Sequence, residues 1–190
     1  MKKIKIVLGV ALLLAGWIAT ARAEVWSGKA HIEFQATSTL HDFSGTVQTE
    51  PFQFIVDPDG TWVTLAATAS VAVAHMNTQH AKRDENMRKM FDAARFPSIR
   101  GEIDSIRVNP TLQPEIPLRL TMLNRTQVIP ATLRNWRLEN GLLHVDLAMT
   151  ISLQKSGLSP PVILGFIKVG DTVDVLIHIE LKAEPFSSPL

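Results

Sequence analysis

Hydrophobic and polar residues alternate with a period of two along most of the chain. The alternating runs cover residues 30–36, 52–56, 62–73, 99–108, 116–122, 143–153 and 173–181. Because successive side chains of a strand point to opposite faces, this pattern predicts about eight β-strands that each bury one face. The phase of the alternation shifts between Ile103 and Ile106, which predicts a β-bulge near Ser105.

Turn signals separate these runs and indicate antiparallel hairpins. The sequences Asp-Pro-Asp-Gly at 57–60 and Asn-Gly at 140–141 are typical hairpin connections. The runs 62–73 and 143–153 are longer than an average strand, and long antiparallel strands avoid exposed edges by closing into a barrel. We therefore expect a mainly β fold, an antiparallel barrel of about eight strands with one amphipathic helix. A two-sheet sandwich is the alternative architecture.

One segment departs from the alternation and predicts a single amphipathic helix over residues 79–94. The apolar residues at helical spacing on one face are Met87, Met90, Phe91 and Ala94. Asn77 or Thr78 is expected to cap the start of the helix, and the Phe-Pro pair at 96–97 is expected to end it. Such a helix either buries its apolar stripe as a connector or forms a lid over a ligand cavity.

The N-terminus has the three parts of a secretory signal peptide. Three lysines within the first five residues precede an apolar run of 14 residues at 6–19, and Ala21-Arg22-Ala23 supplies a small-x-small cleavage site. The apolar run is short of the roughly 20 residues that a membrane span needs. We therefore expect residues 1–23 to be removed and residues 24–190 to form a single domain, soluble in the periplasm.

Charge and composition exclude several classes of protein. The predicted signal peptide holds four of the 19 basic residues and none of the 18 acidic ones, so the remaining chain has 15 basic residues against 18 acidic. This balance argues against a nucleic-acid binder, which normally carries a basic stripe. The absence of cysteine excludes a disulfide scaffold, a thiolate nucleophile and a cysteine-ligated zinc site.

The residues with candidate chemistry are few, and we expect neither a catalytic set nor a cofactor. Ser38, His41 and Asp42 lie in one short segment, whereas a catalytic triad draws its members from separate elements. A structural turn is therefore the favoured interpretation of this segment. The alternative is a small metal-binding protein or hydrolase that uses His41, Asp42, His75 and His80, which requires the fold to gather all four.

The predicted barrel interior carries unusually small side chains in places. The inward positions of 62–73 are Val63, Leu65, Ala67, Ala69, Val71 and Val73. Because protein interiors are densely packed, small inward residues imply either close approach of other elements or space for a guest. Burial of an apolar chain of about 15 carbons, at about 0.8 kcal/mol per methylene, contributes roughly 10 kcal/mol before ordering costs. A barrel packed solid by its own side chains is the alternative.

Three segments together resemble a known family. They are Thr-Leu-His-Asp-Phe-Ser-Gly-Thr-Val at 39–47, Lys-Arg-Asp-Glu-Asn-Met at 82–87 with Phe-Asp at 91–92 and Phe-Pro at 96–97, and Val-Gly-Asp-Thr-Val at 169–173. On these segments the chain resembles the YceI-like family of bacterial secreted proteins. The resemblance implies a lipocalin-like antiparallel barrel with an internal apolar tunnel, and binding of a polyisoprenoid or related amphiphile in the periplasm.

The function expected from these observations is that of a carrier or sequestering protein, not an enzyme. Its partner is a hydrophobic small molecule, namely a polyisoprenoid, a quinone or a fatty chain, and the assembly is either a monomer or a homodimer. The residues expected to line the tunnel are Phe34, Phe54, Leu65, Ala67, Leu120 and Val145, with Met87, Met90 and Phe91 near the opening. Arg83 is expected to meet a polar or anionic head group, or else to form a salt bridge on the helix surface with Asp84 or another neighbour.

Overall fold

A computed structural model describes residues 23–160, 162–163 and 167–185 of the chain. The strands are β1 (Glu24–Ser38), β2 (Phe43–Gln48), β3 (Phe52–Asp59), β4 (Trp62–Ala72), β5 (Ser98–Val108), β6 (Glu115–Met122), β7 (Arg125–Glu139), β8 (Leu142–Ser152), β9 (Val162–Ile163) and β10 (Ile167–Ala183). One α-helix, α1 (Ala81–Met90), and two 3-10 turns, η1 (Val73–His75) and η2 (Pro110–Leu112), accompany them. Residues 1–22 of the predicted signal peptide lie outside the described residues, so that peptide stays a prediction.

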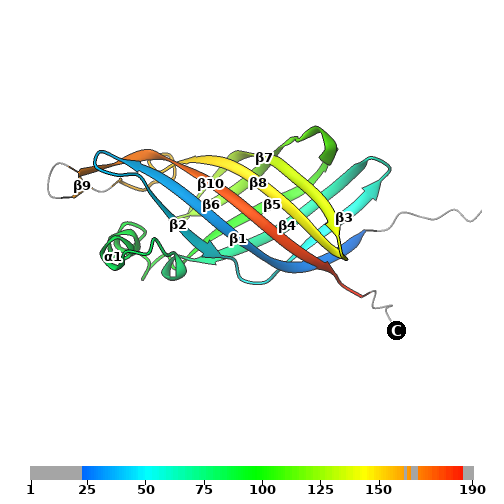
Figure 1. The fold of residues 1–190 in the computed structure, drawn as a ribbon, viewed down its shortest axis with the longest axis horizontal. Helices are drawn as coiled ribbons and strands as arrows, with labels where there is room; N and C mark the ends of the chain where they lie inside the picture. The colour runs from blue at the N-terminus through cyan, green and yellow to red at the C-terminus, as the bar shows by residue number, and fades with distance from the viewer. Residues whose placement is uncertain (1–22, 161, 164–166, 186–190) are drawn as a thin grey trace, which may run out of the picture.

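Eight long strands close into an antiparallel barrel, which confirms the fold expected from the alternation (Figure 1). The strand order is β1-β3-β4-β5-β6-β7-β8-β10, and pairing of β1 with β10 closes the circle. The closure rules out the sandwich. The extra strand β2 pairs with one half of β1, from His31 to Ala36, while β3 pairs with the other half, from Glu24 to Gly28.

The change of phase in the sequence marks a bulge in β5, as predicted. Leu65 of β4 pairs with Ile106, and Ala67 pairs with Ile103, so two residues of β5 oppose a single residue of β4. The extra residue lets both isoleucines face their β4 partners despite their odd spacing.

The barrel is packed solid at one end and hollow at the other. At the end that holds both termini of the described chain, large apolar side chains fill the interior. The members of this packed end include Trp26, Val56, Leu65, Ile116, Leu133, Leu143, Val145 and Leu181, which are each at most 7% exposed. The other end, which carries α1 and the β1–β2 turn, contains the cavity described below.

The helix is shorter than the sequence predicted, and its cap is a different residue. Gln79 has a left-handed backbone at φ 60° and His80 is extended, so neither belongs to the helix, and Asp92 at φ 46° ends the following turn. The Nδ1 atom of His80 accepts a hydrogen bond from the Arg83 amide, which makes His80 the cap in place of Asn77 or Thr78. Within the described part of the chain, α1 is the longest helix and falls well short of a bilayer span.

Candidate ligand-binding site

An apolar cavity of about 500 Å³ occupies the hollow end of the barrel. Its wall is formed by inward side chains of the barrel strands and by one face of α1, and includes Phe34, Phe52, Ile103, Leu120, Met149 and Val175. The volume lies within the range of about 300–1,000 Å³ that is typical of small-molecule sites. A cavity of this size and polarity suits an apolar guest.

Small residues on neighbouring strands create the space. Ala67 and Ala69 of β4 line the cavity, and Ala69 pairs directly with Gly101 of β5, which has no side chain to fill the gap. Ala30 and Ala36 of β1 are also part of the wall. The small inward residues noted in the sequence thus leave space for a guest. They do not serve a close approach of other elements at Gly101, because an added Cβ there would have its nearest neighbour at 3.6 Å.

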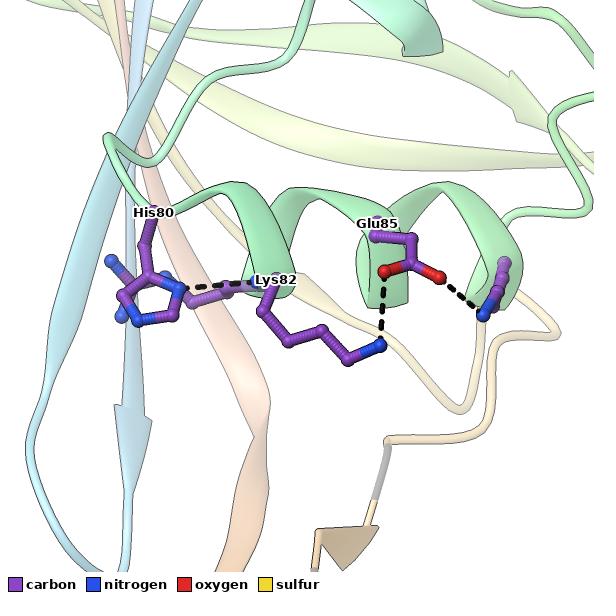
Figure 2. Close-up of polar contacts among 5 residues, drawn as sticks. His80, Lys82 and Glu85 are labelled. Atoms are coloured by element: carbon purple, nitrogen blue, oxygen red, sulfur yellow. Dashed lines mark hydrogen bonds and ion pairs between the residues drawn. The ribbon is translucent and has the colours of Figure 1, made fainter.

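Polar side chains gather where the cavity reaches the surface, a region we call the mouth. The mouth is defined by Ser38, Leu40, His41, His80, Lys82, Arg83 and Asn86. Leu40 is 59% exposed although it also lines the cavity, so this region connects the interior with solvent. Figure 2 shows His80 at the start of α1, followed by Lys82, which turns toward Glu85 along the outside of the helix. An apolar interior with a cationic rim matches the two parts of an anionic amphiphile.

A buried threonine and a buried aspartate fix α1 to the segment that leads into it. Asp84 is buried and its Oδ1 accepts hydrogen bonds from the Thr78 amide at 2.9 Å and the Thr78 hydroxyl at 2.5 Å. Arg83 donates to the Thr78 hydroxyl at 2.9 Å and to the Thr78 carbonyl at 2.8 Å, and its guanidinium lies 4.7 Å above the Phe43 ring. In place of the alternative salt bridge between Arg83 and Asp84, both side chains bind Thr78.

Comparison with protein families decides the classification. The model of the YceI-like domain matches residues 18–181. The chain belongs to the YceI-like family. Comparison with curated proteins finds no match.

The YceI-like barrel is also similar to solved structures at low sequence identity. A polyisoprenoid binding domain from Saccharophagus degradans has a TM-score of 0.62 at 14% identity, covering 86% of this chain and all of that one. BcnA from Burkholderia cenocepacia has a TM-score of 0.58 at 13% identity, covering 80% and 95%. The YCEI protein of Campylobacter jejuni has a TM-score of 0.50 at 12% identity, covering 98% and 100%. At these identities the likeness shows the fold.

Most of the residues predicted to bind the ligand line the cavity of this YceI-like domain. Those in the wall or mouth are Phe34, Phe54, Ala67, Met87, Met90, Phe91, Leu120 and Arg83. Leu65 and Val145 are outside the wall, because both lie in the packed end, where they are 0% and 1% exposed. Contact between any of these residues and a ligand stays a prediction.

Sequence reasoning missed the roles of several residues that shape the site. Thr78 anchors α1 but has only the signature of an ordinary cap, and Leu158 reaches the cavity from the turn after β8. The sequence places Asp84 among four consecutive charged residues at 82–85, which predicts a polar helix face. In the structure its three neighbours are exposed or half-exposed, whereas Asp84 is buried. The only sequence feature that indicates the hydrogen bond between Thr78 and Asp84 is their spacing on either side of the helix start.

The four residues of the alternative metal site do not form one. The described residues contain no group of three or more His, Asp or Glu side chains able to hold a metal ion. Asp42 accepts a hydrogen bond from the Ser38 amide, and the Ser38 hydroxyl donates to the His41 carbonyl at 2.7 Å, so this segment is the structural turn favoured above. His75 is exposed on η1, and the Nδ1 of His80 is used to cap α1.

Replacing Asp84 with asparagine is expected to lower the free energy of unfolding by about 2 kcal/mol, because hydrogen bonds to a buried carboxylate are worth about 1.5–3 kcal/mol. Burial alone would raise the pKa of Asp84, but the hydrogen bonds from Thr78 and the charges of Arg88 and Arg83 outweigh it and hold the pKa below its usual range. The carboxylate therefore stabilises the fold at pH values above the ordinary pKa of aspartate. This stabilisation is lost as the pH falls through the lower pKa that Asp84 has in the folded state.

Denaturant unfolding at about pH 7 and again at about pH 3 measures both effects, because the difference between wild type and Asp84→Asn should shrink at the lower pH. Asp92→Asn, an exposed acid just after the helix, is the control and should leave stability nearly unchanged. A difference that persists in full at the lower pH would contradict the assigned role of the carboxylate.

Proposed function

We propose that this chain is a periplasmic carrier or sequestering protein that binds a polyisoprenoid or another long-chain amphiphile with its tail in the cavity. The observation that carries the proposal is the apolar cavity of about 500 Å³ inside a barrel whose other end is packed solid. A solved barrel of similar fold is described as a polyisoprenoid binding domain, which supports this ligand class. The predicted signal peptide supports export to the periplasm.

The energetics favour a ligand with a long apolar tail. Each methylene moved from water into such a cavity contributes about 0.8 kcal/mol, so a tail of about 15 carbons supplies roughly 10 kcal/mol gross. Loss of translational and internal freedom offsets part of this gain. The gross gain comes from apolar burial, so the tail needs no polar contact with the predominantly apolar wall.

A titration with a naturally fluorescent polyene fatty acid tests the proposal. Its fluorescence should rise on transfer into the cavity and saturate at one ligand per chain, and an unlabelled prenyl alcohol should displace it. A rise that does not saturate, or one that no long-chain competitor reverses, would contradict a single internal site.

Arg83 is the residue proposed to meet an anionic head group. Replacing it with glutamine is expected to weaken a long-chain carboxylate about tenfold, because a charge-assisted hydrogen bond at a half-buried site is worth about 1.5 kcal/mol. An alcohol with the same chain should lose less than about threefold, since it carries no charge for the guanidinium to pair with.

Arg83→Lys separates this role from a structural one. The lysine keeps the positive charge but cannot reproduce the two hydrogen bonds to Thr78. If the guanidinium binds the head group, Arg83→Lys should retain most of the preference for the carboxylate over the alcohol. Equal weakening of both ligands in both variants would show that Arg83 only holds α1 in place.

A further inference from the structure

The two ends of the barrel differ in charge. The mouth end consists of residues 38–43, 73–97, 122–126, 152–160 and 168–171, which are the turns and strand tips around the cavity opening. Its eight basic residues are Lys82, Arg83, Arg88, Lys89, Arg95, Arg125, Lys155 and Lys168. Its five acidic residues are Asp42, Asp84, Glu85, Asp92 and Asp171. The formal charge of the mouth end is therefore positive in a chain whose body is acidic overall.

The packed end has the opposite balance. Its strand tips and turns, at 23–26, 57–62, 107–115, 134–142 and 182–185, hold the acidic residues Glu24, Asp57, Asp59, Glu115, Glu139 and Glu184. The basic residues there are Arg107, Arg134, Arg137 and Lys182. The formal charge is thus about +3 at the mouth end and about −2 at the packed end. Such an asymmetry orients a protein in the electric field of a charged surface.

Ion pairing at the mouth end leaves an excess of cations, because one carboxylate, Glu85, is shared by two lysines. Asp84 is buried against Thr78, and Glu85 accepts from both Lys82 at 2.9 Å and Lys89 at 2.6 Å, as Figure 2 shows for Lys82. The basic side chains are accessible: Lys82 and Lys89 are 66% and 67% exposed, and Lys155 is exposed as well. The mouth end therefore presents accessible cations around an apolar opening.

We propose that the mouth end docks on a bilayer that contains anionic phospholipid, with Leu40 at the contact. Leu40 is 59% exposed and continues the cavity wall, so its insertion among acyl chains would join two apolar regions. Docking in this orientation lets a tail pass between bilayer and cavity without crossing water. The inference rests on the proposed function, because it gives the route by which a membrane-derived ligand enters and leaves.

Two triple variants of equal charge test the docking. Lys89→Gln/Lys155→Gln/Lys168→Gln removes three cations from the mouth end, none of which lines the cavity. Arg134→Gln/Arg137→Gln/Lys182→Gln removes three cations from the packed end and is the matched control. Each lysine or arginine near an anionic surface is expected to raise partitioning about fivefold, so the first variant should bind about 100-fold more weakly and the second within about twofold of wild type.

Flotation assays measure how much of the protein, expressed from the full-length chain, binds to vesicles. One set of vesicles contains phosphatidylcholine alone, and the other contains equal parts of phosphatidylcholine and phosphatidylglycerol. Wild type should float only with the anionic vesicles, and the bound fraction should fall as the salt concentration rises. The Leu40→Ser variant should show a smaller bound fraction than wild type. Equal binding to both vesicles, equal loss in the two triple variants, or no binding at all would overturn the proposal, the last outcome favouring an acidic protein as partner.

The fatty-acid titration distinguishes failure of docking from failure of the proposed function. Both triple variants keep the cavity wall intact and should bind the fluorescent fatty acid like wild type. If wild type binds the fatty acid but no vesicle, docking is wrong and the carrier function stands. If it binds neither, both proposals are wrong.

Discussion

Replacing Ala69 with tryptophan is expected to weaken binding of a long-chain ligand by more than about 100-fold while the barrel remains folded. Ala69 lines the cavity and pairs with Gly101, so an indole at this position extends into the space assigned to the tail. Displacing about four methylenes at about 0.8 kcal/mol each accounts for a loss of this size. The titration with the fluorescent fatty acid measures it.

The matched control is Ala66→Trp, three residues earlier on the same strand. Ala66 belongs to the opposite phase of β4 and pairs with the exposed Ile55 of β3, so the same added volume there lies on the outer face of the barrel. This variant should bind the ligand within about twofold of wild type, because surface substitutions leave buried contacts unchanged. Full binding by a folded Ala69→Trp variant would mean that the tail lies elsewhere.

Replacing Gly28 with alanine is expected to destabilise the protein by about 3 kcal/mol or more, which is at or above the usual cost of overpacking. Gly28 sits on the strand that closes the barrel, paired with Leu181 of β10 on one side and with Phe52 of β3 on the other. An added Cβ would overlap the carbonyl oxygen of Glu180 and approach the Leu181 Cα at 3.0 Å. These are backbone atoms of the seam, so the clash is relieved only by opening the β1–β10 pairing.

Gly101→Ala provides the comparison, because an added Cβ there would meet only the Leu118 Cδ1 at 3.6 Å, an ordinary contact. Its stability should be unchanged or raised by up to about 1 kcal/mol, since alanine reduces the freedom of the unfolded chain. Denaturant midpoints of the two variants measure the difference. Similar midpoints for Gly28→Ala and wild type would show that the seam is more adaptable than its backbone geometry indicates.

The strands could be predicted from sequence because each buries one face, and even the bulge at 104–105 appears as a change of phase. The arrangement of β2 and β3 could not be predicted in the same way. Both strands pair with β1, end to end along one edge, and alternation within a strand carries no information about which edge it shares. The helix was found by its periodicity, but its ends depend on the backbone angles at Gln79 and Asp92.

The site was predictable only in part, for a related reason. Ala67 lines the cavity and Leu65 does not, although both occupy the inward phase of β4. Leu65 pairs with Val56 and Ile106 in the packed end, whereas Ala67 lies next to the level where Ala69 pairs with Gly101. Which part of a barrel is hollow depends on side chains from several strands at one level, which no single run reveals.

The central claim is that the hollow end of this barrel holds one long-chain amphiphile. Native mass spectrometry of the protein purified from its own cells, followed by organic extraction and analysis of the released lipid, tests it most directly. The account predicts a complex of one chain with one long-chain species, released on extraction and lost in the Ala69→Trp variant. A chain that carries no bound species in the native spectrum, and yields none on extraction, would contradict it.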